Sequence, residues 1–339
     1  MITVENWLPA DYRQASLRAD ALAGLSADPK SLPPKWFYDA RGSDLFEQIT
    51  TLPEYYPTRA ERSILGDVAG TIARLTGAST LVELGSGSSE KTRLLLDALR
   101  AEGTLRRYVP VDVSESALLA AGAAVAADYP QIDVRAVVSD FDTRLGLDAA
   151  DGTAADGTAA DGTADENDEG PRLVAFLGST IGNMAPAERA KFLARIRDGL
   201  RPGDALLLGT DLVKDPAVLV AAYDDAAGVT AAFNKNVLSV INSELGADFD
   251  PGAFDHMAVW DPDEEWIEMR LRSAASQEVH VPAIRLTATF ALGEEMRTEI
   301  CAKFRRSGVD AELAAAGLSM RSWWTDSAGQ FGLSLSSPA

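Results

Sequence analysis

Between residues 80 and 213 the chain alternates short, continuously apolar runs with longer stretches whose apolar residues recur at helical spacing. Apolar runs of four to eight residues are typical of strands buried on both faces, and intervening helices favour a parallel sheet covered on both sides. We therefore predict a doubly wound α/β domain. Its five strands are expected at residues 81–84, 108–113, 134–139, 172–177 and 204–213.

The pattern changes after residue 213. Two helical stretches, at 216–226 and 229–245, precede residues 253–290, in which apolar and polar positions alternate as in antiparallel strands. The chain then returns to a helix and two strands over residues 312–337. We predict that residues 62–212 and 304–339 form the doubly wound domain, and that residues 1–61 and 213–303 form a second, smaller α+β domain.

Two helix starts are predicted within the N-terminal segment. Asp44 followed by Glu47, and Thr58 followed by Glu61, have the spacing of a capping box, in which each side chain caps the other's backbone. They predict a short helix over 44–50 and a longer one that runs from residue 58 to residue 75.

Residues 151–164 repeat the sequence DGTAA and run into the acidic segment 165–170. A small, acidic stretch without apolar periodicity cannot form a core, so we expect residues 151–170 to be a flexible surface loop. A calcium-binding loop is the alternative interpretation, although the segment lacks the bidentate glutamate and carbonyl spacing of such loops. The role of the repeat is left open.

Composition narrows the possible partners. The formal net charge of −20 at pH 7 disfavours binding to nucleic acid or to an anionic membrane. One cysteine excludes an internal disulfide, and two histidines leave little material for a transition-metal site, so we expect no metal. No signal peptide and no apolar stretch of about 18 residues is seen. We predict a cytoplasmic protein; the oligomeric state stays open, with a monomer as the expectation.

The glycine-rich segment 85–92, GSGSSEKT, follows the first predicted strand. It misses both the dinucleotide pattern and the P-loop pattern at one position, where Glu90 replaces glycine. A carboxylate about 4 Å from a phosphate opposes it by roughly 4 kcal/mol at an effective dielectric near 20. ATP and NAD are therefore poor candidates, and an NAD-dependent oxidoreductase or a nucleotide-binding module is the less favoured alternative.

S-adenosylmethionine has an adenosine and a positive charge but no phosphate. Residues 82–87, VELGSG, resemble motif I of the Rossmann-like methyltransferases. Asp112 lies at the end of the second predicted strand, where an acid can accept the ribose hydroxyls. Asp140 and Phe141 follow the third, where this family has an acid for the adenine amine and an apolar residue for its ring. Lys91 is a candidate partner of the methionyl carboxylate. Helix capping or simple solvation is the alternative explanation for acids such as Glu83 and Asp140.

The fourth predicted strand runs into residues 178–184, GSTIGNM, at the sheet edge where ligands bind in such folds. The Asn183 amide has both donors and acceptors, so it suits an ammonium and a carboxylate together. Stabilisation of the turn after Gly182 is the alternative role for this asparagine.

Seven segments, spread over nearly the whole chain except residues 150–170, resemble the histidine Nα-methyltransferases of ergothioneine biosynthesis. The resemblance implies transfer of three methyl groups from S-adenosylmethionine to L-histidine, giving hercynine; a methyltransferase acting on another amino acid or small amine is the alternative. These segments are residues 30–50, 52–59, 82–93, 176–183, 206–215, 222–234 and 293–304.

The same resemblance implies site residues. Tyr38 is the expected catalytic residue, beside the amine, and Glu299 is expected to accept the imidazole N–H. The substrate residues implied are Tyr55, Asn183, Tyr223, Met269, Glu299, Cys301 and Gly178. The cofactor residues implied are Gly85, Lys91, Asp112, Asp140 and Phe141.

Strand periodicity puts Glu299 and Cys301 of TEICAKF on one face. A rim ion pair is the alternative role for Glu299, and a small buried side chain without a ligand is the alternative for Cys301. The family often has serine where this chain has Cys301. Because a thiol bonds weakly, we expect the change to cost about 0.5–1.5 kcal/mol of affinity, and its effect on substrate preference is left open.

Overall fold

The computed structural model describes residues 2–87, 91–140, 145–147 and 170–339. The sequence predictions for Glu90, for Phe141 and for the repeat at 151–164 lie outside these residues. Everything below refers to the described part of the chain.

A mixed sheet of eight strands forms the larger unit, in the order β1-β4-β3-β2-β5-β6-β13-β12. Neighbouring strands from β1 to β6 run parallel, whereas β13 is antiparallel to both β6 and β12. The strands are β1 (Ile2–Asn6), β2 (Thr80–Leu84), β3 (Arg107–Asp112), β4 (Asp133–Val138), β5 (Arg172–Phe176), β6 (Ala205–Asp211), β12 (Leu318–Thr325) and β13 (Phe331–Pro338).

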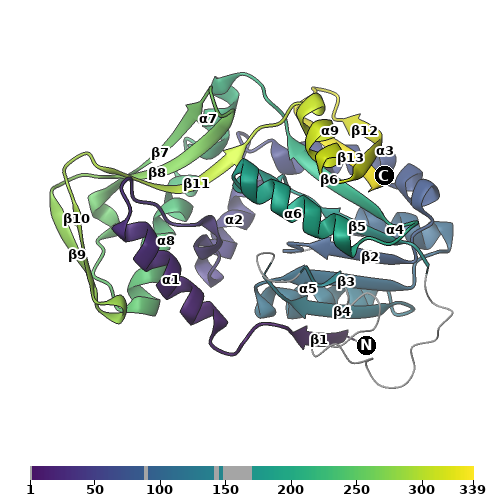
Figure 1. Ribbon diagram of the computed structural model, residues 1–339, viewed down its shortest axis with the longest axis horizontal. Coiled ribbons are helices and arrows are strands. Elements are labelled where there is room, and N and C mark those ends of the chain that lie inside the picture. The colour runs from purple at the N-terminus through teal and green to yellow at the C-terminus, as the bar shows by residue number, and fades with distance from the viewer. Residues whose placement is uncertain (1, 88–90, 141–144, 148–169) are drawn as a thin grey trace.

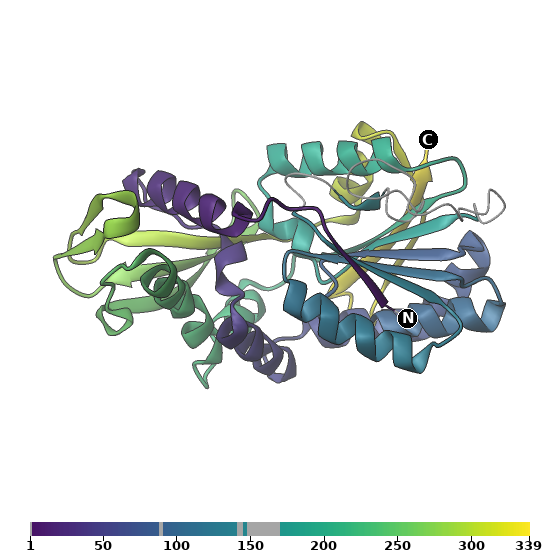
Figure 2. The same cartoon turned by 90° about the horizontal axis from the view of Figure 1, so that it is seen from below.

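Helices cover both faces of this sheet, as Figure 2 shows. Alternate residues of a strand face opposite layers. Leu81 of β2 packs in one apolar cluster with α3, α4 and α5, whereas its neighbour Val82 packs in another with α6 and α9. The helices are α3 (Pro57–Thr76), α4 (Thr92–Glu102), α5 (Glu115–Asp128), α6 (Pro186–Gly199) and α9 (Arg306–Ala315). The prediction of a doubly wound α/β fold is confirmed.

The N-terminal strand differs from expectation. The sequence analysis placed residues 1–61 with the second domain, but Ile2–Asn6 pairs in parallel with β4 at the edge of the central sheet. Ile2 and Val4 pack against the small cluster around Leu118 of α5, which explains why this short segment lies here. Five residues are too few to show a clear period, so the pattern alone did not indicate a strand.

The two predicted helices of the N-terminal segment form, but they begin elsewhere. Asp39 caps α2 (Ala40–Thr51) by accepting a hydrogen bond from the Gly42 amide at 2.7 Å, so the helix starts before Asp44. The longer helix, α3, begins at Pro57, and its start has no side-chain cap. Proline at the first helical position is favoured because its missing N–H has no intrahelical role there.

The smaller unit has its own apolar core. Helix α8 packs against α1, α2 and a three-stranded antiparallel sheet of order β11-β8-β7, with the hairpin β9–β10 beside it (Figure 1). Its helices are α1 (Tyr12–Ser26), α2, α7 (Pro216–Tyr223) and α8 (Val229–Leu245). Its strands are β7 (Phe254–Asp261), β8 (Trp266–Ser273), β9 (Gln277–Val281), β10 (Leu286–Phe290) and β11 (Glu295–Ala302).

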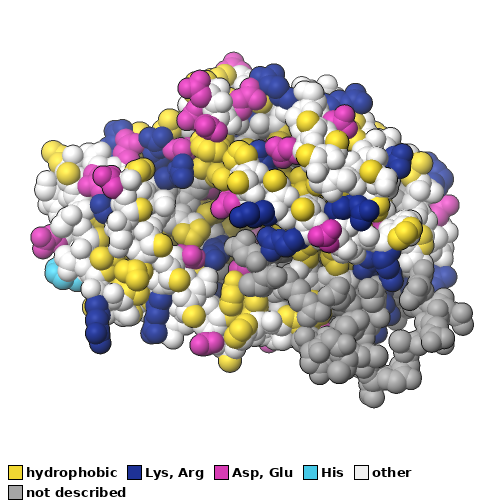
Figure 3. Space-filling model, in the orientation of Figure 1, with side chains coloured by type: hydrophobic (Ala, Val, Ile, Leu, Met, Phe, Trp, Pro, Cys, Tyr) yellow, Lys and Arg dark blue, Asp and Glu magenta, His cyan; other side chains and the backbone are white. Residues whose placement is uncertain are grey.

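Buried residues from Leu17 to Tyr56 and from Leu219 to Cys301 share this core, and the bounds of the two domains stay a prediction. Short 3-10 helices complete the described structure: η1 (Pro34–Phe37), η3 (Thr180–Asn183), η4 (Pro251–Ala253) and η5 (Pro282–Ile284). On the face drawn in Figure 3, acidic and basic side chains both spread over the surface. Among the described helices, none has the length and apolar character needed to cross a bilayer.

Candidate active site

The sheet reverses direction of winding between β2 and β5, and the loops at the carboxyl ends of these strands surround the candidate site. In open α/β sheets this switch point is the usual ligand crevice. Gly85 and Gly87 have φ values of 68° and 49°, which side chains other than glycine rarely adopt. The Gly85 amide donates to the Val111 carbonyl at 2.8 Å, so the glycine loop is fixed against β3.

Asp112, at the end of β3, lies beside this loop. Its carboxylate accepts hydrogen bonds from the backbone N–H groups of Gly87, at 3.3 Å, and Ser114, at 3.0 Å. Burial raises the pKa of Asp112, and these N–H groups oppose the shift. The Ser86 hydroxyl is buried here without a hydrogen-bond partner in the described residues. An acid and an unused hydroxyl beside two glycines fit a nucleoside whose ribose approaches the backbone closely.

Asp140 follows β4 and is buried, as the sequence prediction requires of an adenine-binding acid. The Tyr12 hydroxyl of α1 donates to it at 2.8 Å, and the Lys35 ammonium lies 4.0 Å away. Tyr12 and Lys35 come from segments next to the smaller unit, so this unit contributes side chains to the cofactor half of the crevice. The apolar residue expected beside Asp140, Phe141, lies outside the described residues.

Lys91 is paired with a carboxylate of the protein itself. Its ammonium forms an ion pair with Glu61, a carboxylate of α3 that is 0% exposed. Glu61 also accepts from the Gly178 amide, at 2.8 and 3.1 Å through its two oxygens. Glu61 therefore joins the glycine-rich loop to the loop after β5, with Gly178 in the left-handed region at φ 76°.

Glu83 belongs to the core rather than to the ligand surface. It is 4% exposed and accepts hydrogen bonds from Thr92 and from the Tyr108 hydroxyl, the latter at 2.5 Å. Burial raises its pKa to about 7, against these two donors. Glu83 is therefore neither a helix cap nor a solvated acid, as the alternative interpretation expected, but a buried acid that connects β2, α4 and β3.

Five aromatic rings of the smaller unit pack together beside the candidate site. The Tyr38 ring packs against Phe46 and Phe233 at centroid distances of 5.6 and 5.4 Å, and Tyr55 packs against Phe46 at 6.3 Å. Tyr55 also lies 6.3 Å from the ring of Tyr223, at the end of α7. The predicted catalytic tyrosine, Tyr38, and the two predicted substrate tyrosines, Tyr55 and Tyr223, are thus connected through ring contacts, Tyr38 and Tyr55 by way of Phe46. These apolar contacts leave the hydroxyls as polar tips.

Glu299 of β11 faces the turn after β5. Its carboxylate accepts a hydrogen bond from the Asn183 amide nitrogen at 3.0 Å. Burial raises the pKa of Glu299 to about 7, while Lys303 and Asn183 act in the opposite direction. Met269 of β8 lies opposite Glu299 in the strand register and is 2% exposed. An N–H donor brought by a ligand would favour the carboxylate form of this buried acid.

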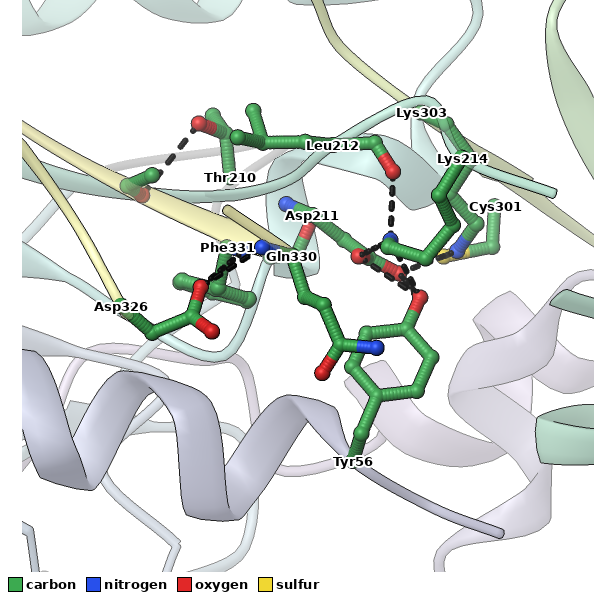
Figure 4. Close-up of polar contacts among 12 residues, drawn as sticks. Tyr56, Thr210, Asp211, Leu212, Lys214, Cys301, Lys303, Asp326, Gln330 and Phe331 are labelled. Atoms are coloured by element: carbon green, nitrogen blue, oxygen red, sulfur yellow. Dashed lines mark hydrogen bonds and ion pairs between the residues drawn. The ribbon is translucent and has the colours of Figure 1, made fainter. Parts of the chain in front are cut away.

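Cys301 lies next on β11, 5% exposed, in a triangle of polar groups. Its sulfur accepts from the Tyr223 hydroxyl at 2.9 Å and from the Lys303 ammonium at 3.1 Å, and Lys303 also donates to the Tyr223 oxygen at 2.9 Å. Figure 4 shows Cys301 and Lys303 beside Asp211, which pairs with Lys303 at 3.0 Å.

Sequence reasoning missed Glu61, Tyr12, Asp211 and Lys303. Lys303 had a visible signal, because it comes two residues after Cys301 in the same motif, as Cys301 does after Glu299. Asp211 lies within the predicted strand 204–213 and is the last residue of the observed β6, at the ligand edge of the sheet. Glu61 was interpreted only as a helix cap, and Tyr12 had no local signal. Among the described residues, no cluster of His, Cys, Asp and Glu is arranged to hold a metal ion.

Comparison with known proteins gives one consistent family. A family model described as histidine-specific, SAM-dependent methyltransferase matches residues 17–338. The chain is 57% identical over 334 residues to histidine N-alpha-methyltransferase of Mycolicibacterium smegmatis, and 54% identical to that of Mycobacterium tuberculosis, with 98% of each chain covered. It is 31% identical over 305 residues to ergothioneine biosynthesis protein 1 of Neurospora crassa, which covers 88% of this chain and 32% of that protein.

Proposed function

The chain belongs to the family of histidine-specific, S-adenosylmethionine-dependent methyltransferases, and we propose that it transfers three methyl groups to the α-amino nitrogen of L-histidine. The product is trimethylhistidine (hercynine), and the reaction is a step of ergothioneine biosynthesis. The observation that carries this proposal is the 57% identity to a histidine N-alpha-methyltransferase over 98% of both chains.

S-adenosylmethionine supplies a methyl group that its sulfonium has already activated. We assign its ribose to Asp112, its adenine to Asp140, and its methionyl part to the backbone at Gly85. Lys91 is fixed by Glu61, so we propose that this pair, rather than Lys91 alone, neutralises the ammonium and carboxylate of the methionyl group. The carboxylates at the strand ends repel phosphates and attract a cation, which supports this ligand over NAD or ATP.

The acceptor histidine is assigned to the other side of the crevice. Glu299 accepts the imidazole N–H, with Met269 against the ring, and the amide of Asn183 contacts the amino-acid head group. Tyr55 and Tyr223 bind the head group with their hydroxyls. Gly178, without a side chain, leaves room where the loop after β5 meets Lys91, whose ammonium would lie 3.6 Å from an added β-carbon.

The nucleophile is the neutral amine. Histidine enters as an ammonium ion, loses a proton and attacks the methyl carbon in line; the methylated nitrogen is again a cation, so each of three rounds releases one proton. Deprotonation costs about 1.36 kcal/mol for each unit between the pKa of the amine and the pH. We propose that Tyr38, a neutral phenol, assists by hydrogen-bonding the amine or by passing its proton through water to the solvent, while positioning supplies up to ~7–11 kcal/mol.

The site has to accept growing bulk at the nitrogen. The rings of Tyr38 and Phe46 pack edge to face at a centroid distance of 5.6 Å, next to the position assigned to the amine. Aromatic faces attract a quaternary ammonium without needing N–H donors, which supports completion of all three rounds.

One assay tests the proposal. The purified protein is incubated with L-histidine and S-adenosylmethionine, and the products are followed by mass spectrometry. Mass gains of one, two and three methyl groups on the α-nitrogen are expected, with S-adenosylhomocysteine released in proportion. The proposal would be overturned if histidine stayed unmodified while the enzyme methylated another amino acid or amine. That result would favour the alternative acceptor.

The remaining expectations stay predictions from the sequence: a monomer in the cytoplasm that needs no metal. The metal prediction is tested in the same assay, because a chelator should leave the rate unchanged. Loss of activity with EDTA and recovery with one divalent cation would contradict it.

A further inference from the structure

Lys303 is a buried lysine that the proposed reaction does not use. The residue is 3% exposed and its side chain is 0% exposed. A buried ammonium is costly unless all its donors are paired. Its three hydrogens have three acceptors within reach: Asp211 at 3.0 Å, the Tyr223 oxygen at 2.9 Å and the Cys301 sulfur at 3.1 Å.

The charge around Lys303 does not balance locally. Asp211 also pairs with Lys214 at 2.5 Å and accepts from the Tyr56 hydroxyl at 2.8 Å, so one carboxylate serves two ammonium groups. Figure 4 shows both lysines converging on Asp211. The cluster of Asp211, Lys214 and Lys303 therefore has an excess positive charge. Through Lys303 this charge acts on the Glu299 carboxyl and on Tyr223, both on the substrate side.

Lys303 also fixes the direction of the hydrogen bonds beside it. A lysine ammonium only donates, so the oxygen of Tyr223 has to accept from it, and the tyrosine's own hydrogen is left to donate. In the structure this hydrogen goes to the Cys301 sulfur, a weak acceptor, at 2.9 Å. An incoming carboxylate is a much stronger acceptor than a sulfur, so it takes over the Tyr223 hydrogen.

Strand β11 and Lys303, the residue after it, thus carry side chains that would bind different groups of a ligand. Glu299 offers a carboxyl to an N–H donor, whereas Lys303, through Tyr223, offers a donor and positive charge to an anion. We propose that Lys303 is a positioning residue that determines specificity: it makes Tyr223 select an α-carboxylate, so free amino acids bind and amines lacking that group are rejected. The inference rests on the proposed function, in which Tyr223 contacts the substrate head group.

The test compares L-histidine with histamine, which keeps the imidazole and the amine but has no carboxylate. For K303M, binding to the complex with S-adenosylhomocysteine is measured by calorimetry, and KM and kcat are measured for histidine. We expect the Kd and KM for histidine to rise about 10- to 100-fold and kcat to change less than about threefold. Histamine should weaken much less, because it shares only the imidazole contact with Glu299, on which Lys303 also acts. The preference for histidine over histamine therefore falls.

K214M is the matched control. It also removes one lysine from Asp211, but it leaves Lys303 against Tyr223, so the preference should be retained. Unchanged histidine binding in K303M, or an equal loss in K214M, would overturn the inference. If K303M does not fold, the D211N/K303M variant removes both members of the buried ion pair and is measured in its place. A wild-type enzyme that methylates histidine upholds the proposed function whichever result K303M gives.

Discussion

The side-chain amide of Asn183 donates a hydrogen bond to the carboxylate of Glu299 at 3.0 Å. Asn183 ends the turn that follows β5 of the central sheet, whereas Glu299 lies on β11 of the smaller sheet. The bond turns the amide nitrogen toward Glu299, which directs the amide oxygen away from the carboxylate. One contact therefore orients two side chains proposed to bind the substrate: Asn183, for the head group, and Glu299, for the imidazole.

Replacing Asn183 by alanine should reduce kcat/KM for histidine about 10- to 100-fold, because a hydrogen bond to a charged group and a head-group contact are both lost. Steady-state kinetics and thermal unfolding are measured on the same preparations. N242A is the control: Asn242 bonds the backbone of Phe249 at 2.7 and 2.9 Å, within the smaller unit, so its loss should lower stability and leave kcat/KM unchanged. Full activity in N183A would contradict the role given to this residue.

Histidine binding should depend on the protonation of Glu299. Burial raises its pKa to about 7 from an ordinary value of about 4.3, so the free enzyme is half protonated near neutral pH. Only the carboxylate accepts the imidazole N–H with full strength, so the KM for histidine should fall as the pH rises through about 7. The imidazole of the substrate titrates in the same pH range, with a pKa of about 6.5. The pH dependence of KM that comes from the substrate should persist in E299Q, whereas the pH dependence that comes from Glu299 should vanish.

The same shift predicts the direction of a stability change. A carboxyl whose pKa is raised by folding binds its proton more tightly in the folded state. Its contribution to the free energy of unfolding is therefore complete below about 4.3 and is lost as the pH rises through about 7. Denaturant unfolding of E299Q between pH 5 and pH 8 should show a flatter decline than the wild type. An identical decline in both proteins would mean that Glu299 titrates normally.

Much of the fold follows from the hydrophobic pattern. Five buried strands and the helices between them were predictable because unbroken apolar runs and helical periods are strong local signals, and all five form the centre of the sheet. The edge strand Ile2–Asn6 was not predictable, because it has only five residues and its partner β4 is far away in the sequence. Helix starts were displaced because Asp39, and not Asp44, makes the capping bond.

The site was predictable where the sequence carried a motif. Asn183, Tyr223, Glu299 and Cys301 are brought together as neighbours or through shared partners. The pairing of Lys91 with Glu61 was not predictable, because it depends on how α3 crosses the carboxyl end of β2. The contact of Tyr12 with Asp140 likewise depends on the position of α1, which no local pattern sets. Local sequence identifies the chemical groups, whereas their partners depend on packing between distant segments.

The stability of the protein should depend strongly on an ion pair at the amino ends of strands β5 and β6, away from the candidate site. Arg172 and Asp204 have side chains that are 2% exposed and approach to 2.6 Å, and Arg172 also donates to the Gly199 carbonyl at 2.6 Å. R172M leaves Asp204 buried without this partner, which should cost about 3–5 kcal/mol of unfolding free energy in chemical denaturation. Arg201 lies 4.0 Å from the same carboxylate and is 37% exposed, so R201M should cost less than about 1 kcal/mol. Equal effects of the two variants would contradict a special role for the buried pair.

Replacing Cys301 by serine should strengthen histidine binding. The sulfur accepts hydrogen bonds from Tyr223 and Lys303, so the thiol hydrogen is the one left to donate toward the substrate, and a thiol donates weakly. When the substrate carboxylate has taken over the Tyr223 hydrogen, a serine hydroxyl still accepts from Lys303 and donates a stronger bond toward the substrate, which should lower the KM for histidine about three- to tenfold with a smaller change in kcat. C301A separates hydrogen bonding from size, because it removes the polar atom and should bind histidine less well than C301S. Weaker binding in C301S than in the wild type would show that the pocket is fitted to the larger sulfur, and that Cys301 acts by packing against its neighbours.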